Sequence, residues 1–434
     1  MKTILQREVG VWGLSFNMIN IMIGAGIFVL PAIIAEGLGP ASIFAYLICG
    51  VLISLVMLCF AEVGSVITDD GGVYAYLDRT LGDYFGFKAA TLFLLGAMSA
   101  DAAIANAIAD IASSLIGVEF SKAIRALFFF LIFGGLALIN IRGARSGLLL
   151  VKTITIAKLA PLVLLILFAS GEINFANLAI HDMPSIKEFG QVSLILFFAF
   201  MGSESGLSIS GEVKNPQKII PRAIFLAISI ALVLYMLIQG ATLGVLGPSL
   251  SEFKENPLGE VAHQLIGPVG LTLMIIGAGV SMFGNLSSEI LSLPRILFGA
   301  SKDRVIPVNI LSRIHPKFAT PYVAIIAIAG IDFLLATFGG FEQLAIFATA
   351  TILLVYFGMA IAVIKLRKIN PEKPEGSFRI PGGYTVPVLT AVVIIWFLSN
   401  LTKNEILGIV AVIAFLSLIY FIFVKRMKAK NPPS

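Results

Sequence analysis

Residues 22–31 read MIGAGIFVLP and lie inside the first strongly apolar stretch of the chain, residues 11–35. Three small residues, Gly24, Ala25 and Gly26, stand together in the middle of that stretch, and Pro31 follows. Each glycine costs about 1 kcal/mol of helix stability relative to alanine. Inside a bilayer, unpaired backbone is tolerated only where it lines a cavity or binds something. If this stretch crosses a membrane, it therefore predicts a helix that is interrupted for binding.

The composition places the chain in a membrane. It has 434 residues, of which 58% are hydrophobic and 13% charged, with a mean hydropathy of +0.99. Apolar runs of about 20 residues, long enough to cross a bilayer as helices, recur along its whole length. Short alternating segments of the kind that build membrane β-barrels are absent. We therefore predict an all-α polytopic protein of the cytoplasmic membrane, one transmembrane domain over residues 1–434.

Twelve apolar segments are predicted to span the membrane. They cover residues 11–35, 40–68, 86–117, 122–141, 146–170, 190–211, 221–247, 268–299, 320–338, 341–364, 386–402 and 405–424.

The distribution of lysine and arginine predicts the orientation. With the N-terminus inside, 24 of the 30 basic residues fall on the cytoplasmic side, five fall outside, and Lys158 lies within a span. Such a bias indicates twelve spans with both termini cytoplasmic. The isoelectric point near 9.1 is thus a topology signal and does not indicate nucleic acid. The short loops leave no room for a soluble catalytic domain.

A second interruption is predicted in the sixth segment, where residues 196–212 read LFFAFMGSESGLSISGE. Its Gly-rich centre runs from Gly202 through Ser203, Glu204 and Ser205 to Gly206. Five spans separate the two breaks, and an odd offset means that the second half enters from the opposite side of the membrane. This predicts an inverted repeat of spans 1–5 (residues 11–170) and 6–10 (190–364), with two extra helices at 386–424.

Two broken helices suit a zwitterionic solute. Freed N–H groups at the start of a half-helix can hold a carboxylate, and freed carbonyls can accept bonds from an ammonium group. The alternative is that these glycines merely permit close packing of helices.

Charged residues inside the apolar segments are functional candidates, because membrane burial of charge is costly. Lys158 lies roughly 16 Å into the fifth span and is a candidate for proton coupling or for a permanent bond to carbonyls. Glu204 could carry a proton, pair with a substrate cation, or serve a structural hydrogen bond. Asp101 and Glu289 could recognise a positive group on the substrate or bond within the bundle.

Other residues receive structural interpretations. Asp110 and Asp332 are interpreted as interface residues and Glu62 as structural. Cys49 and Cys59 are expected to be free thiols, since ten residues of helix separate them by roughly 15 Å. No histidine falls in an apolar run, so no metal site is predicted.

At this point the motifs resemble those of the amino acid–polyamine–organocation (APC) permeases. The matching stretches are MIGAGIFVLP, FAEVGSVITDDGGVYAYLDRTLGDYFGF with Glu62, Gly71, Gly72, Tyr74 and Tyr76, FFAFMGSESGLSISGEVKNPQKIIPRAI with Gly202, Glu204, Glu212, Asn215, Pro216 and Pro221, and later LPRILFGASKDRVIP and FRIPGGY. They cover essentially the whole chain in order.

The resemblance implies a LeuT-type 5+5 inverted repeat that works by alternating access on an amino acid or related amine. By analogy, backbone at the first break would hold the substrate carboxylate, and backbone at the second break its amine. The implied substrate-binding residues, together with Asp101, are Ile23, Gly24, Ala25, Gly26, Phe198, Phe200, Met201 and Gly202. Phe198 stands where arginine/agmatine exchangers carry a tryptophan gate, and a phenylalanine there weakens that particular assignment. Asp69 and Asp70 depart from the family pattern.

The resemblance also implies roles for two residues in coupling transport to an ion. Lys158 falls where sodium-independent members carry a lysine in place of a sodium ion, and Glu204 matches an acid implicated in proton response. We therefore expect a secondary transporter of amino acids, coupled to protons and independent of sodium, acting without cofactor as a monomer or homodimer. The alternative within this class is a polyamine or basic amino-acid exchanger.

Two other classes are disfavoured by the sequence. A channel would need repeated loops or rings of selectivity residues. A membrane enzyme would need a nucleophile, metal or cofactor motif, and G-x-S-x-G, HExxH and P-loop patterns are missing.

Overall fold

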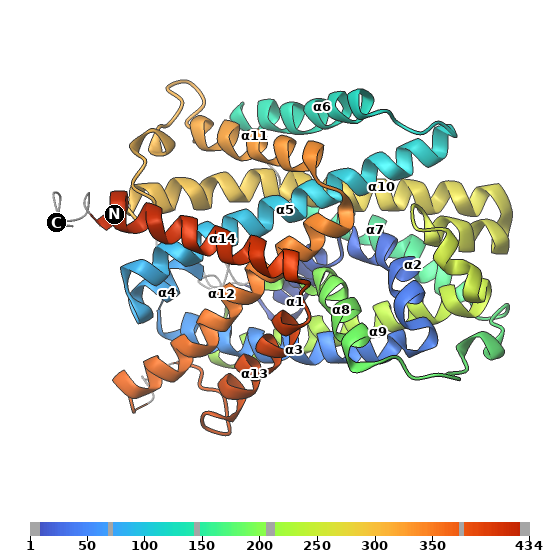
Figure 1. The fold of residues 1–434 in the computed structure, drawn as a ribbon, viewed down its shortest axis with the longest axis horizontal. Helices are drawn as coiled ribbons and strands as arrows, with labels where there is room; N and C mark the ends of the chain where they lie inside the picture. Colours follow the sequence, from blue (N-terminus) through green and yellow to red (C-terminus); the bar gives the residue numbers. More distant parts are fainter. Residues whose placement is uncertain (1–8, 68–72, 143–147, 205–212, 373–376, 426–434) are drawn as a thin grey trace.

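The computed structural model describes residues 9–67, 73–142, 148–204, 213–372 and 377–425, and for residues 148–157, 216 and 217 it describes the backbone only. Helices dominate these ranges and no strand occurs in them; a single isolated bridge joins Val9 and Val213. Figure 1 shows several long helices running along the longest axis of the molecule and others lying oblique to them. The all-helical prediction is confirmed for the part of the chain that the structure describes.

The helices, in chain order, begin and end as follows. The first half contains α1 (Val11–Met22), α2 (Gly26–Leu38), α3 (Ser42–Val66), α4 (Val73–Leu81), α5 (Asp83–Ile116), α6 (Lys122–Ile141) and α7 (Leu148–Ala169). The second half contains α8 (Ile186–Phe197), η3 (Phe198–Phe200), α9 (Pro216–Leu246), α10 (Pro257–Lys302), α11 (Tyr322–Phe338) and α12 (Phe341–Ile369). The last two long helices are α13 (Thr385–Ser399) and α14 (Lys403–Ile419), and short 3-10 turns and one π turn, η7 (Tyr420–Val424), complete the path.

Each of the twelve predicted apolar segments contains helix. Within the described residues, seven helical stretches are long and apolar enough to cross a membrane, and four shorter apolar helices accompany them. Large apolar side chains cover the outer helices, with Leu131 on α6 62% exposed and Leu407 on α14 66% exposed. A soluble protein rarely exposes so much contiguous apolar surface. The chain is a multi-pass membrane protein.

Local sequence decides where several helices begin. Ser185 and Thr402 each form a capping box with the glutamate three residues later, Glu188 and Glu405. Such a box satisfies two of the N–H groups that a helix start leaves without partners. Within α10, Gly267 has a φ of 67°, which favours glycine, and Pro268 follows. The kink lies where the predicted eighth segment begins.

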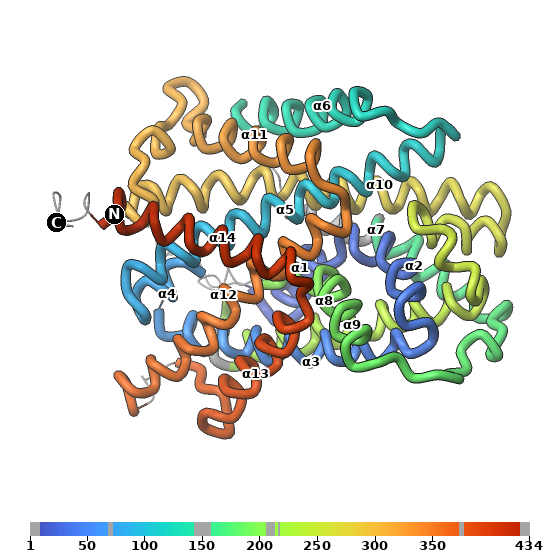
Figure 2. Tube along the Cα trace, viewed as in Figure 1, coloured from blue at the N-terminus to red at the C-terminus, as the bar shows by residue number. Residues whose placement is uncertain are grey.

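The helices pack in pairs that are distant in sequence. α12 lies along α5 through the middle of the molecule, α1 and α3 pack on α9, α10 packs on α7, and α11 packs on α6. Figure 2 shows α5, α6, α10 and α11 together on one side of the molecule and α3, α9 and α13 on the other. The interrupted helices α1 and α2, together with α8, are thereby surrounded by α3, α7, α9, α10 and α12.

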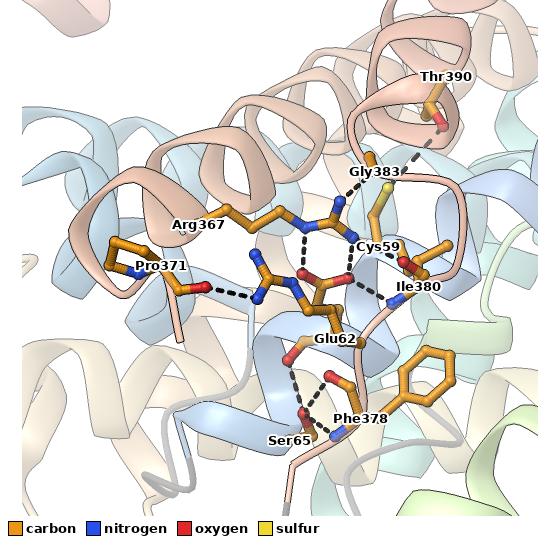
Figure 3. Close-up of polar contacts among 10 residues, drawn as sticks. Cys59, Glu62, Ser65, Arg367, Pro371, Phe378, Ile380, Gly383 and Thr390 are labelled. Atoms are coloured by element: carbon orange, nitrogen blue, oxygen red, sulfur yellow. Dashed lines mark hydrogen bonds and ion pairs between the residues drawn. The ribbon is translucent and has the colours of Figure 1, made fainter. Parts of the chain in front are cut away.

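A buried ion pair ties α3, α12 and the segment before α13 together (Figure 3). Arg367 donates from Nε and Nη2 to the two carboxylate oxygens of Glu62, both at 2.6 Å. The N–H of Ile380 donates to Glu62 at 2.7 Å, and Arg367 also donates to the carbonyls of Ile380 and Gly383. Both side chains are under 5% exposed. Glu62 is therefore a structural residue of the fold, as its position in the sequence indicated.

The two cysteines are free and buried, as expected. Cys59 lies 3.8 Å from the hydroxyl of Thr390 on α13, beside the same ion pair. Cys49 donates to the carbonyl of Ser193 on α8 at 3.4 Å. Both thiols thus serve packing between helices.

Candidate functional site

The first predicted break is confirmed. α1 ends at Met22 and α2 begins at Gly26, and Ile23 between them has φ −79° and ψ 86°, which is not helical. Ile23 and Ala25 are at most 1% exposed, so this unwound backbone lies in the interior of the protein. Pro31 lies one turn into α2, where its ring nitrogen leaves the carbonyl of Ile27 without the usual donor.

Side chains from three other helices satisfy the carbonyls at the end of α1. Helix ends leave their last four carbonyls without intrahelical donors. Here four consecutive carbonyls, those of residues 20–23, each accept a bond from a side chain. The donors are Lys158 to Asn20, Asn285 to Ile21 at 3.3 Å, Tyr235 to Met22 at 3.0 Å, and Lys158 and Ser281 to Ile23 at 2.7 and 3.3 Å.

Three of the N–H groups that follow have no backbone acceptor. Gly24 donates to the carbonyl of Met22 at 2.9 Å, and Phe28 donates to that of Ala25 at 3.0 Å. Between them, the N–H groups of Ala25, Gly26 and Ile27 have no backbone acceptor in the described ranges. Three adjacent N–H groups at the start of α2 form an anion-binding arrangement, because the helix dipole adds to their partial positive charge.

The second predicted break is also present as far as the structure describes it. α8 ends at Phe197, a single 3-10 turn follows at Phe198–Phe200, and Met201 is extended with ψ 163°. Gly202 has a φ of 90°, a conformation that side-chain-bearing residues rarely adopt. Ser205 and Gly206, which the sequence also assigned to this break, lie outside the described residues.

The two breaks touch each other. A Cβ atom added to Gly26 would lie 2.8 Å from the Cβ and 2.9 Å from the Cα of Ala199. The hydroxyl of Tyr235 on α9 lies within hydrogen-bond distance of both breaks, 3.0 Å from the Met22 carbonyl and 2.9 Å from that of Ala199. One hydroxyl can donate to only one of them at a time. Tyr235 is therefore shared between the two unwound segments.

The aromatic residues of the second break differ in their surroundings. Phe198 packs edge-on against Phe341 at the start of α12, with ring centroids 5.7 Å apart. Phe200 is fully buried and packs edge-on against Tyr46 and Tyr235. Met201 accepts a bond from Thr349 of α12 at its sulfur. Phe198 therefore lies at the contact of the second break with α12, whereas Phe200 belongs to the core behind it.

The predicted charged residues fall into two groups. Lys158 is 2% exposed and is bound to the first break, and Glu204 is 6% exposed in the second break, with the Tyr356 hydroxyl close to its carboxyl group. Asp101 is fully buried on α5 and interacts electrostatically with Asp332 and Glu289. The structure thus brings Lys158 and Glu204 to the breaks, while no described contact joins Asp101 to them.

Four residues near the breaks were not singled out from the sequence: Tyr235, Ser281, Asn285 and Phe341. The first three are polar residues within apolar runs, which is a signal that could have identified them. Phe341 is one of 33 phenylalanines and carries no such signal.

Comparison with known proteins decides the family. A model of the amino acid permease family matches residues 9–433. The chain belongs to the amino acid permease family. The predicted resemblance to APC permeases is thereby confirmed.

Three relatives are between 24% and 29% identical to this permease. The serine/threonine exchanger SteT of Bacillus subtilis is 29% identical, over 89% of each chain. From the same organism, a methylthioribose transporter is 29% identical and the branched-chain amino acid permease BcaP is 24% identical, both over 98% of this chain and 95% of theirs. These relatives are named as transporters, and their named substrates differ from one another.

Proposed function

We propose that this permease moves an amino acid across the cytoplasmic membrane by alternating access, coupled to protons and independent of sodium. The observation that carries the proposal is the position of the Lys158 amine among the carbonyls at the end of α1. In transporters with broken helices, such carbonyls coordinate the coupling cation. A protonated Lys158 would supply that positive charge from the protein itself and would let a proton take the role of a metal ion.

The substrate in this proposal is a zwitterion. Its carboxylate is bound by the N–H groups of Ala25, Gly26 and Ile27. Ile23 and Gly24, which precede them in the break, form the adjacent wall of the site. Its amine is bound by backbone oxygens between Phe198 and Gly202, with Met201 beside them. Binding both ends of an α-amino acid with main-chain groups leaves its side chain to be selected by neighbouring residues.

Phe198 and Phe341 form the lid of the proposed site. Both rings are less than 10% exposed, and the described backbone of both breaks is largely enclosed. Substrate entry therefore requires these rings to separate, and alternating access requires this on one side of the membrane at a time. Substrate shifts the balance between outward-open and inward-open forms only through different affinity for the two.

Glu204 is the second proposed proton carrier. Its carboxyl group is buried at the break, and one of its oxygens has no hydrogen-bond partner among the described residues. The preferred protonation state of a buried carboxyl group changes when it loses hydrogen bonds from its neighbours or when a substrate amine binds beside it. Proton exchange at Glu204 would thus follow substrate binding and release.

The proposed architecture is the LeuT-type one, with repeats over residues 11–170 and 190–364 and two extra helices. Both termini are cytoplasmic in this proposal, in agreement with the bias of basic residues. The two breaks lie in the first helix of each repeat, which is where an inverted repeat would place its binding site.

A second candidate is exchange of polyamines or basic amino acids. The observation in its favour is the pair of intramembrane acids Asp101 and Glu289, which could recognise a cationic side chain. The relative SteT is a serine/threonine exchanger, and this also favours an exchange mechanism without net proton flux as the second candidate.

The test begins with a binding screen on the purified permease. The twenty amino acids, common polyamines and methylthioribose are added in turn, and stabilisation against thermal unfolding is measured. Uptake of the best binder into proteoliposomes is then recorded with a proton gradient, with a sodium gradient, and with unlabelled substrate inside. A response to the proton gradient alone supports the proposal; dependence on internal substrate alone indicates exchange, and sodium dependence contradicts the role given to Lys158.

A further inference from the structure

An apolar crevice lies between α7 and α10, away from the unwound backbone of the two breaks. Its volume is about 280 Å³, and its walls come from residues between 160 and 168 of α7 and between 262 and 280 of α10. Each described residue that lines it is a glycine, an alanine, a proline or a larger apolar residue. A polar solute such as the proposed amino acid substrate therefore finds no side chain to bind there.

A turn within α10 closes one end of the crevice. Ile266 and Gly267 leave the helical conformation, with φ of −134° and 67°. A Cβ atom added to Gly270 would lie 2.3 Å from the carbonyl oxygen of Ala262, whereas eight residues of straight helix span about 12 Å. The segments on the two sides of the turn therefore lie against each other. Ala262, Leu265 and Ile266 form the wall at this end.

At the other end of the crevice, α7 and α10 touch directly. A Cβ atom added to Gly277 would lie 2.6 Å from Cγ of Pro161. Lys158 lies about one turn before Pro161, and Ser281 lies about one turn after Gly277. Both side chains donate to the carbonyl of Ile23 at the first break. The crevice thus ends one helical turn from two of the groups that hold the first break.

The open side of the crevice faces the membrane. Leu164 and Phe168 of α7 and Leu273 and Ile276 of α10 line it and are nevertheless between 44% and 58% exposed. In a multi-pass membrane protein, exposed apolar side chains of this size form a membrane interaction surface or a ligand-binding groove. The crevice is therefore continuous with the surface that this permease presents to lipid.

Hydrocarbon is the ligand chemistry that suits the crevice. A cavity of about 150 Å³ lined by Leu, Ile and Phe stays free of water and binds small hydrocarbons, and this crevice is larger. From Pro161 to Phe168 it extends about 10 Å along α7. One leaflet supplies half of the roughly 30 Å of hydrocarbon in a bilayer. A single acyl chain within one leaflet is therefore long enough to fill the crevice.

We propose that the crevice between α7 and α10 binds one acyl chain of a membrane lipid as a resident ligand. The chain packs between the two helices that bring Lys158 and Ser281 to the first break. Its binding stabilises α7 against α10 in the arrangement that holds the first break. This inference goes beyond the proposed function and holds whichever solute the permease transports.

The direct test is native mass spectrometry of the purified, full-length permease after extensive washing with detergent. Ala160→Phe places a ring in the crevice, because Ala160 lines it and is exposed. Ala414→Phe is the matched control, since Ala414 is an exposed alanine on α14 and does not line the crevice. We expect the wild type and Ala414→Phe to retain one phospholipid, and Ala160→Phe to lose it.

Two results overturn the proposal. One is a phospholipid that Ala160→Phe retains as well as the wild type does, or a wild type that retains none. The other is a dimer without retained lipid that Ala160→Phe alone dissociates, which would assign the crevice to a second copy of the chain. Because no substrate is present, either result leaves the proposed amino acid transport as it stands.

Photolabelling of the wild type provides a measurement that needs no folded variant. One molar equivalent of a phosphatidylglycerol with a diazirine in one acyl chain is added to the delipidated permease, and labelled peptides are identified after illumination. We expect the label on residues between 160 and 168 and between 262 and 280. A label spread over the exposed faces of α6 and α14 to the same extent would show surrounding lipid only, and would contradict the proposal.

Thermal unfolding measures whether the bound chain stabilises the two helices. A ligand that binds only the folded protein raises its unfolding temperature. We expect added phosphatidylglycerol to raise the unfolding temperature of the delipidated wild type and of Ala414→Phe, and to raise that of Ala160→Phe less, because the ring already fills the crevice. An equal rise in all three proteins would exclude the crevice as the stabilising site.

Discussion

The amine nitrogen of Lys158 lies 2.7 Å from the carbonyl oxygen of Ile23, although 135 residues separate them in the sequence. The same nitrogen also donates to the carbonyl of Asn20. A lysine from α7 thus occupies the place at which α1 stops being a helix. This contact connects the conformation of the first break to the protonation of one buried side chain, because a neutral amine has fewer protons to donate and no charge to offer.

Lys158→Ala is expected to abolish the pH dependence of uptake while largely preserving substrate binding. Each buried carbonyl left without a donor costs about 1–3 kcal/mol, so the variant should also unfold at a lower temperature. Lys88→Ala is the matched control. Lys88 is another buried lysine that donates to a carbonyl, but its acceptor is Ile413 of α14 and not a carbonyl of either break. Uptake into proteoliposomes across a pH series provides the measurement, and a wild-type pH profile in Lys158→Ala would rule out the coupling role.

Tyr235→Phe is expected to loosen the contact between the two breaks. The variant removes a hydroxyl that lies within hydrogen-bond distance of the Met22 and Ala199 carbonyls. We expect a loss of stability of about 1–3 kcal/mol and weaker substrate binding. Tyr46→Phe is the control, because that hydroxyl bonds Gln239 and neither break carbonyl. Equal binding losses in the two variants would show that Tyr235 has no special role at the breaks.

Gly26→Ala tests whether the close approach of the breaks is required. The added Cβ would lie within 3 Å of two atoms of Ala199, one of them in the backbone. Overpacking of this kind costs typically about 1–3 kcal/mol, and here it displaces the N–H groups proposed to bind the carboxylate. Gly134→Ala on α6 meets nothing within 4 Å and should be neutral or slightly stabilising. Binding affinity of Gly26→Ala that equals that of Gly134→Ala would argue against the proposed carboxylate site.

The ion pair between Glu62 and Arg367 is predicted to matter for stability and not for substrate selection. Glu62→Gln should destabilise the protein by about 3–5 kcal/mol, because it leaves a buried guanidinium without its charged partner. The half-exposed pair of Asp110 and Arg125 should lose less, about 0–1 kcal/mol for Asp110→Asn. Thermal or chemical unfolding in detergent compares the two variants. An unchanged unfolding midpoint for Glu62→Gln would show that the ion pair does not hold α3 and α12 together.

A compensating double variant sharpens this prediction. Replacing both partners by apolar residues of similar volume, Glu62→Leu with Arg367→Met, removes both charges at once. Such replacements are often neutral or stabilising. Recovery of part of the lost stability in the double variant, with the substrate preference of the wild type, is the expected result, because the backbone groups of Ile380 and Gly383 lose their side-chain partners together with the charges.

The sequence alone predicted the fold class and the places where helices are interrupted. Composition requires a membrane protein, since a chain that is 58% hydrophobic cannot bury its apolar surface in water. The small residues at positions 24–26 predict a break because glycine is unfavourable in a helix and unpaired backbone is unfavourable in a bilayer. Both effects are local, so neighbouring residues suffice to identify them.

Tertiary structure alone decided which side chains satisfy the unwound backbone. The donors to the carbonyls of residues 20–23 come from α7, α9 and α10. A helix fixes the spacing of residues along its own axis but not the partner that its buried face meets. Since hydrogen bonds and charge interactions act over a few ångströms, the chemistry of these groups was decided only when helices distant in the sequence packed against each other.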